Sequence, residues 1–214
     1  AGSATHQITG GPAGIPTELY RQLRLELGLR AAAPVVEEYV RALELGDRPL
    51  RLLGVDAFAE APFRQYLSAI TVDNDNTGDD AFNALNAFIA EPGALLISQP
   101  LAARFGVQVG DSITLRAGMR QVPARVVGLL QPGDRVSEQA LADLILTDIA
   151  TAQEIAGRAG ALTRIDLILP EQGRDALVAG IEALLPEGAR LTGISEGNTT
   201  LDQMTAAFNL NLQA

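Results

Sequence analysis

Apolar and polar residues alternate along the chain with two different periods, which together predict a mixture of short strands and helices. Short apolar or alternating runs are typical of strands; they occupy residues 4–9, 33–43, 50–55, 94–97, 112–115, 121–130, 144–147, 163–169 and 190–194. Apolar residues spaced three or four apart predict amphipathic helices; they occupy residues 16–27, 61–70, 79–89, 101–105, 137–142, 149–155 and 172–185. Glycine or proline stands at most of the junctions, where it ends a helix or forms a turn.

The order of these elements predicts two similar units at the ends of the chain. Strand, helix and strand follow one another in both units, and their helices carry the apolar stripes Leu19/Leu23 and Leu177/Ile181. Each unit needs the other to bury its apolar face. We therefore expect an α+β fold. Its predicted parts are one discontinuous α/β domain (residues 1–56 and 161–198), an inserted mixed α/β subdomain (57–160) and a C-terminal segment (199–214).

One continuous stretch carries the most specific pattern. Its residues, with x for unmatched positions, are Leu96-Ile97-Ser98-x-x-Leu101-Ala102-x-x-Phe105-Gly106-Val107-x-x-Gly110-Asp111-x-Ile113-x-Leu115. We expect a tight turn at Gly110, with a positive φ. Two further pieces are Leu53-Gly54-Val55-Asp56 and the segment from Met204 to Leu212. In this order the pieces resemble the extracytoplasmic domain of FtsX-like ABC-transporter permeases, also called the MacB-like periplasmic core domain.

This resemblance implies both a layout and a place in the cell. The discontinuous domain would correspond to the family's Porter subdomain and the insert to its Sabre subdomain. The domain would lie outside the cytoplasm, between the first two membrane helices of a bacterial inner-membrane permease. Its ends would then both return to the membrane, so we expect Thr5 and Thr199 to lie close together. The implied partners are a cytoplasmic ATP-binding subunit or domain and a second permease copy or paralogue.

The implied work is mechanical rather than catalytic, and several roles stay open. Family members extract lipoproteins, export peptides or toxins, or activate cell-wall hydrolases. A lipid-linked cargo is favoured here because the mean hydropathy is +0.15 and aromatic residues are only 4%. The alternatives are an adaptor domain that regulates an envelope partner, such as a cell-wall hydrolase, and a serine hydrolase.

The composition excludes several classes of protein. A hydrophobic content of 47% in 214 residues is typical of a folded chain with an ample core. The net charge is -10, and the basic residues are 16 dispersed arginines with no lysine, which argues against nucleic-acid binding. The absence of cysteine removes disulfides, thiol nucleophiles and cysteine metal sites. No apolar run approaches the ~18 to 20 residues that span a bilayer, so we expect a soluble fragment.

The only serine-hydrolase signal is weak. Gly193-Ile194-Ser195-Glu196-Gly197 follows a predicted strand, as a nucleophile elbow does. The single histidine, His6, lies far upstream, whereas that hydrolase order places the histidine after the serine. We therefore interpret this segment as a turn, with no catalytic residue.

The remaining candidates have structural explanations. Asp73, Asp75, Thr77, Gly78 and Asp79 fit the first half of a calcium loop, but Ala84 stands where a bidentate glutamate is needed. The loop from Gly10 to Gly14 lacks the lysine of a phosphate-binding loop. Glu37 and Glu38 are predicted to face opposite sides of a strand. We expect no catalytic, cofactor or metal site. The tail has helical spacing at its apolar positions, Leu201, Met204, Phe208 and Leu212, which fits an amphipathic helix that packs on the domain. The family resemblance implies instead the start of a membrane helix, and we favour that interpretation.

Overall fold

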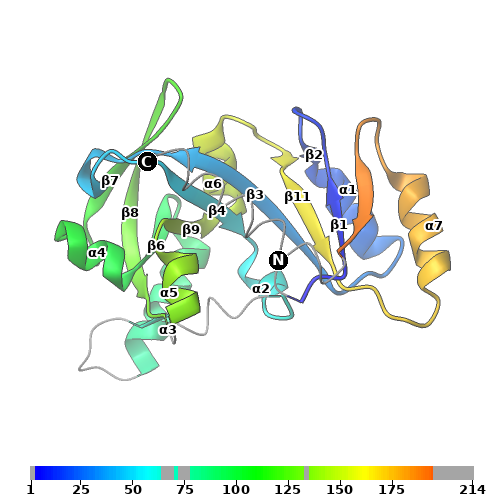
Figure 1. The fold of residues 1–214 in the computed structure, drawn as a ribbon, viewed down its shortest axis with the longest axis horizontal. Coiled ribbons are helices and arrows are strands. Elements are labelled where there is room, and N and C mark those ends of the chain that lie inside the picture. The colour runs from blue at the N-terminus through cyan, green and yellow to red at the C-terminus, as the bar shows by residue number, and fades with distance from the viewer. Residues whose placement is uncertain (1–2, 64–69, 72–77, 133–134, 195–214) are drawn as a thin grey trace, which may run out of the picture.

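A computed structural model describes residues 3–63, 70–71, 78–132 and 135–194 of the chain. Ten of the strands in this part form one mixed sheet that runs through the whole molecule (Figure 1). Their order is β12 (Arg190–Gly193), β1 (His6–Thr9), β11 (Arg164–Leu167), β3 (Ala32–Val40), β4 (Leu50–Val55), β9 (Leu144–Asp148), β6 (Ala94–Ser98), β8 (Arg120–Leu130) and β5 (Ile70–Thr71), with β7 (Ser112–Ala117) also paired to β8. A separate pair joins β2 (Ile15–Pro16) to β10 (Ala161–Leu162).

The two terminal units interleave at one end of this sheet. β1, α1 (Thr17–Leu25) and β3 form one strand-helix-strand unit; β11, α7 (Arg174–Leu184) and β12 form the other. β11 pairs antiparallel with both β1 and β3, and β1 pairs antiparallel with both β11 and β12, so each unit holds a strand of the other. This is the split βαβ arrangement of ferredoxin-like folds. Leu19, Leu23 and Ile181 are buried in one core cluster, against which Leu177 packs, as predicted.

The other half of the sheet holds the strands of the middle section. β9 pairs parallel with β4 and antiparallel with β6, and β6 pairs parallel with β8. The helices of this half are α2 (Ala57–Glu60), α3 (Gly78–Ala90), α4 (Gln99–Phe105), α5 (Arg135–Leu141) and α6 (Ile149–Ala156), and a short 3-10 helix, η1 (Leu43–Leu45), follows β3. The β4–β9 ladder joins the two halves, and the predicted division of the chain at residues 56 and 161 stays a prediction.

The stretch with the most specific pattern folds as its residues predict. β6 leads into α4, which begins after Ser98 and ends at Gly106, and the β7–β8 hairpin follows. Ser98 caps α4, since its Oγ accepts a hydrogen bond from the Leu101 amide at 3.3 Å. Gly110 has a φ of 98°, and its N–H donates to the Val126 carbonyl at 2.7 Å. The expected tight turn with a positive φ is confirmed.

Gly54 explains the close packing of α6 on the sheet. A Cβ at this position would lie 2.3 Å from the Ala152 Cβ and 3.2 Å from the Asp148 carbonyl oxygen. Because real Cβ atoms do not approach so closely, glycine is what lets the first turns of α6 lie directly on β4. This contact is one reason for the pattern Leu53-Gly54-Val55-Asp56.

Two predicted helices differ from the structure. In place of a helix over residues 61–70, the helix α2 lies earlier, at Ala57–Glu60, because the Asp56 side chain caps it by accepting from the Phe58 amide at 2.9 Å. Residues 64–69 lie outside the described part, and residues 70–71 form β5. For the helix over residues 79–89, the apolar spacing predicts that Phe82, Leu85, Phe88 and Ile89 face inward. This prediction is wrong in part, since Phe82 is 63% exposed and Ile89 is 40% exposed. The buried residues of α3 include Ala84, which lets the helix lie close to the sheet, and Phe88.

Candidate functional site

The two ends of the described chain lie side by side. β1 pairs with β12 from His6 opposite Gly193 to Thr9 opposite Arg190. Beyond this ladder, the Ile194 amide donates to the Thr5 carbonyl at 2.8 Å. The chain therefore enters and leaves this part of the fold at one place, although nearly its whole length lies between. Thr199 lies outside the described residues.

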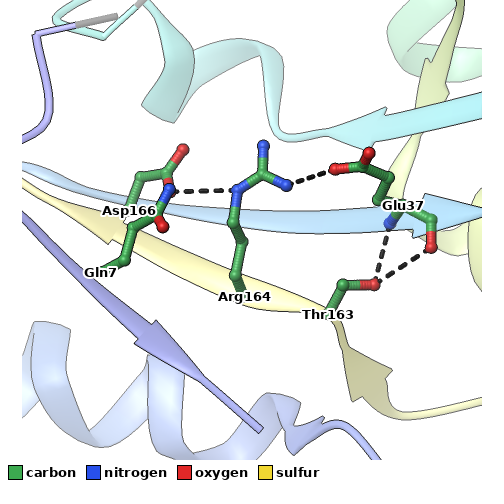
Figure 2. A network of polar contacts seen from close by, with 5 residues as sticks. All are labelled: Gln7, Glu37, Thr163, Arg164 and Asp166. Atoms are coloured by element: carbon green, nitrogen blue, oxygen red, sulfur yellow. Dashed lines mark hydrogen bonds and ion pairs between the residues drawn. The ribbon is translucent and has the colours of Figure 1, made fainter. Parts of the chain in front are cut away.

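A polar network fastens the terminal strand β1 to the long strand β3 (Figure 2). Asp166 is fully buried, and its Oδ1 accepts from Gln7 Nε2 at 2.8 Å and from Arg164 Nε at 3.1 Å. Arg164 Nη1 reaches onward to Glu37 Oε2 at 2.5 Å. The Glu37 amide in turn donates to Thr163 Oγ1 at 2.9 Å. Charge-assisted bonds of this kind hold β1, β11 and β3 in register, in addition to the backbone hydrogen bonds between these strands.

An apolar pocket of about 380 Å³ opens where α1, α2, α3 and α6 meet. It lies at the carboxyl ends of the adjacent parallel strands β4 and β9, where Val55 is opposite Asp148. Open α/β sheets commonly bind ligands outside such strand ends. Phe88 forms a buried part of the wall, whereas Phe58 is 81% exposed at the mouth.

The polar side chains of this pocket include two carboxylates, those of Asp56 and Asp148, and the phenol of Tyr20. Asp56 Oδ1 caps α2, and Asp148 Oδ1 caps α6 by accepting from the amides of Ala150 at 2.8 Å and Thr151 at 3.0 Å. Burial, and then the negative charge of Asp56, raise the pKa of Tyr20 above its ordinary value. Tyr20 therefore stays a neutral hydrogen-bond donor at physiological pH, beside the Asp56 carboxylate.

In the sequence, a serine hydrolase is disfavoured because His6 lies far upstream of Ser195. In the folded sheet this distance along the chain is no longer an argument, because β1 and β12 are neighbours. His6 lies directly opposite Gly193, two residues before Ser195, in spite of the long separation in sequence. Its Nδ1 lies 2.9 Å from Thr5 Oγ1. Burial lowers the pKa of His6, and the charge of Arg174 lowers it further. Ser195 itself lies outside the described residues, so the absence of a catalytic residue stays a prediction.

The other candidates are placed as follows. Asp73, Asp75 and Thr77 of the half-matched calcium loop lie outside the described residues, as does the apolar tail. Within the part that the structure describes, no group of three or more His, Cys, Asp or Glu side chains could hold a metal ion. Glu37 and Glu38 have different partners, Arg164 and Arg158 respectively. In the same described part, no helix has the length and apolar content needed to cross a membrane.

Comparison with known proteins assigns the family. The family description "MacB-like periplasmic core domain" matches residues 2–194. The chain belongs to this family. It is 39% identical over 213 residues to an ABC transporter permease protein of Mycobacterium tuberculosis, Rv0987, covering 100% of this chain and 23% of that protein. The chain thus spans about a quarter of the length of that relative.

Solved structures of two transporters share the fold. The extracellular domain of the noncanonic ABC-type transporter YknZ from Gram-positive bacteria gives a TM-score of 0.57 at 15% identity, covering 88% of this chain and 100% of that one. The periplasmic region of MacB from Actinobacillus actinomycetemcomitans gives 0.52 at 13% identity, covering 96% and 94%. The resemblance stated from the sequence is confirmed, and so is the α+β fold class; the single large mixed sheet is a finding of the structure.

The sequence did not reveal the apolar pocket. Its walls come from segments that are well over a hundred residues apart, such as Thr17 and Gln153, whose side chains also meet at 3.3 Å. The one local signal is an aspartate directly after each of two apolar runs, namely Asp56 and Asp148. The β4–β9 pairing that brings these two aspartates together is what the sequence pattern left open.

Proposed function

We propose that this chain is a non-catalytic extracytoplasmic domain that couples the motion of membrane helices to the handling of an envelope substrate or partner. The permease that carries it would lie in the bacterial inner membrane. A cytoplasmic ATP-binding subunit or domain would drive it, and a second permease copy or paralogue would face it. A lipoprotein or another lipid-linked cargo is the substrate class that we favour.

The pairing of the two chain ends is the observation that supports this proposal best. A domain inserted between two consecutive membrane helices must return its chain to the membrane where it left. The antiparallel β1–β12 ladder and the bond from Ile194 to Thr5 meet that requirement. Both strands are part of the large sheet, so a displacement of the ends acts on the whole domain. Coupling of this kind requires two states with different contacts and no catalytic side chain.

Spin-label distances in the complete transporter test the mechanical role. Met119 is fully exposed in the turn between β7 and β8, and Leu25 is 69% exposed on α1. Cysteine at Met119 in both permease copies reports the distance between the two domains. We expect this distance distribution to shift between the nucleotide-free and the vanadate-trapped transporter. The same distribution in both states would contradict the proposal.

A second pair of labels separates motion of the domain from motion within it. Cysteines at both Leu25 and Met119, in a copy diluted with unlabelled permease, report the length of one domain. An unchanged internal distance with a shifted distance between copies indicates rigid-body motion. A shift in both distances indicates that the half of the sheet with the β7–β8 hairpin moves against the half with the terminal strands.

An ester-hydrolysis assay tests the competing enzyme hypothesis on the isolated chain. We expect no turnover of nitrophenyl acetate or butyrate above the buffer rate. Ser195→Ala and His6→Ala are the two informative variants, because the sheet brings His6 opposite Gly193. Turnover that both substitutions abolish would replace the mechanical proposal with a hydrolase.

A further inference from the structure

The pocket at the ends of β4 and β9 has the features of a site for a small amphiphile. Its volume of about 380 Å³ lies within the range of small-molecule sites, roughly 300 to 1,000 Å³. Most of its walls are apolar side chains, which include Phe58, Phe88 and Ile149. An apolar body placed there would leave water for a largely preformed surface.

The charged side chains that line the pocket are both acidic, although Arg24 lies close enough to Tyr20 to act on its pKa. Asp56 and Asp148 are the charged side chains among its described lining residues, and no arginine or histidine is among them. Their Oδ1 atoms cap α2 and α6. The whole chain carries a net charge of -10, which also attracts cations. Tyr20 adds a neutral hydroxyl, and the Gln153 amide is occupied by the Thr17 hydroxyl and the Ala161 carbonyl.

We propose that this pocket binds a cationic amphiphile, with its apolar body against Phe58 and Phe88 and its positive head group beside Asp56 and Asp148. The proposal does not depend on the mechanical function. It follows from one pocket that combines apolar walls with two carboxylates, one directly after β4 and one at the end of β9. An anionic amphiphile of the same length would face like charge, and a neutral one would gain only the apolar contact.

Three probes with the same tail test the charge preference on the unmodified 214-residue chain. They are octyltrimethylammonium, octyl glucoside and octanoate, each titrated below its micelle concentration and followed by calorimetry and by the NMR signals of Tyr20 and Phe58. We expect saturable binding in the order cation, neutral probe, anion. A partly exposed ion pair contributes up to about fivefold in affinity, so two carboxylates favour the cation over the neutral probe by up to about twenty-fivefold. Equal or tighter binding of octanoate, or no saturable binding of the cation, would overturn the proposal.

Two kinds of variant then separate charge from apolar contact. Asp56→Asn and Asp148→Asn retain a good helix cap, so the fold is kept while the charge is removed. Together they should abolish most of the preference for the cation and leave octyl glucoside binding unchanged. Phe58→Ala should weaken all three probes several-fold, because Phe58 is an exposed wall of the pocket.

The control for net charge lies on and just after α7, at the β12 edge of the sheet and away from the pocket. Glu182 is at the end of α7 and Glu187 follows it, and both are exposed. The double variant Glu182→Gln with Glu187→Gln removes the same charge as the two aspartate variants. It should keep the full preference for the cation. A preference that falls equally in both double variants would show attraction to the surface as a whole and would overturn the assignment to this pocket.

Discussion

Gly54→Ala tests the packing of α6 on the sheet with a single added methyl group. The new Cβ would lie 2.3 Å from the Ala152 Cβ, about 1.2 Å short of the ~3.5 Å at which carbon atoms attract each other. The backbone carbonyl of Asp148, at 3.2 Å, and the Val36 Cβ, at 3.3 Å, leave little room on the other sides. Helix α6 must therefore move away from β4 or the strand must bend.

The expected cost follows from two opposing effects. Overpacking a well-packed core costs about 1 to 3 kcal/mol. Replacing glycine stiffens the unfolded chain, which returns about 0.4 to 1 kcal/mol. We expect the free energy of unfolding to fall by about 1 to 2 kcal/mol, which corresponds to a Tm lower by about 2 to 8 °C in a domain of this size. Urea denaturation, followed by circular dichroism, measures the first quantity.

Two companion variants show whether the cause is the one described. Gly180→Ala places its Cβ in α7 against a flexible Leu27 side chain, at 3.3 Å, and should be neutral or stabilising by up to about 1 kcal/mol. Ala152→Gly removes the methyl group that the Gly54 variant meets. In the double variant the two substitutions should partly compensate, with a coupling of about 1 kcal/mol or more. A neutral Gly54→Ala, or purely additive effects, would refute the packing of α6 directly on Gly54.

Three further variants test other parts of the fold. Gly110→Val forces a branched residue to a φ of 98° and should cost about 1 to 3 kcal/mol in urea unfolding; a neutral result would contradict the turn. Arg164→Met leaves Asp166 and Glu37 without this partner and should lower the free energy of unfolding by about 1 to 3 kcal/mol. Arg158→Met breaks a more exposed pair with Glu38 and should lower it by under about 1 kcal/mol. Equal losses in the two variants would contradict the network. Folding lowers the pKa of His6 from 6.5, so the unfolded chain takes up this proton more readily and stability should fall as the pH falls below about 6.5. His6→Gln should remove this contribution to the dependence of stability on pH. An unchanged pH dependence would contradict the lowered pKa.

The sequence predicted most elements because their signals are local. Ser98 starts α4 through its side-chain cap, and Gly106 ends the helix through its left-handed backbone. Both effects act within a few residues. Phe82 shows where this reasoning fails. Phe82 and Ile89 lie roughly 150° round the helix from Ala84, at about 100° per residue. The largest apolar residues suggested one inward face, but the sheet contacts the face with small Ala84, where the helix can approach closely.

The interleaving of the terminal strands had no local signal. β1 pairs with β11 and β12, which are more than 150 residues away, and its own alternation is the same for any partner. Arg164, Asp166 and Gln7 likewise appear as dispersed polar residues in two alternating runs until the register is known. Residue spacing fixes which side of a strand is buried. It leaves open which strands become neighbours, and the network and the pocket both depend on that.

The sheet also limits how the predicted insert can move. If the proposed function holds, a displacement of the chain ends would reach β1 and β12 first, and the bonds among Gln7, Asp166, Arg164 and Glu37 would carry it to β3. From β3 the displacement would pass to its partner β4, and from β4 to the strands of the middle section. That second step would run through the five parallel residue pairs of β4 with β9, beside the tight contact of Gly54 with α6. Separation at this ladder would expose backbone groups and apolar side chains together, each at a cost of about 1 kcal/mol or more. Twisting of the sheet about β4 and β9 keeps those bonds, so we expect the two halves to rotate against each other rather than to part.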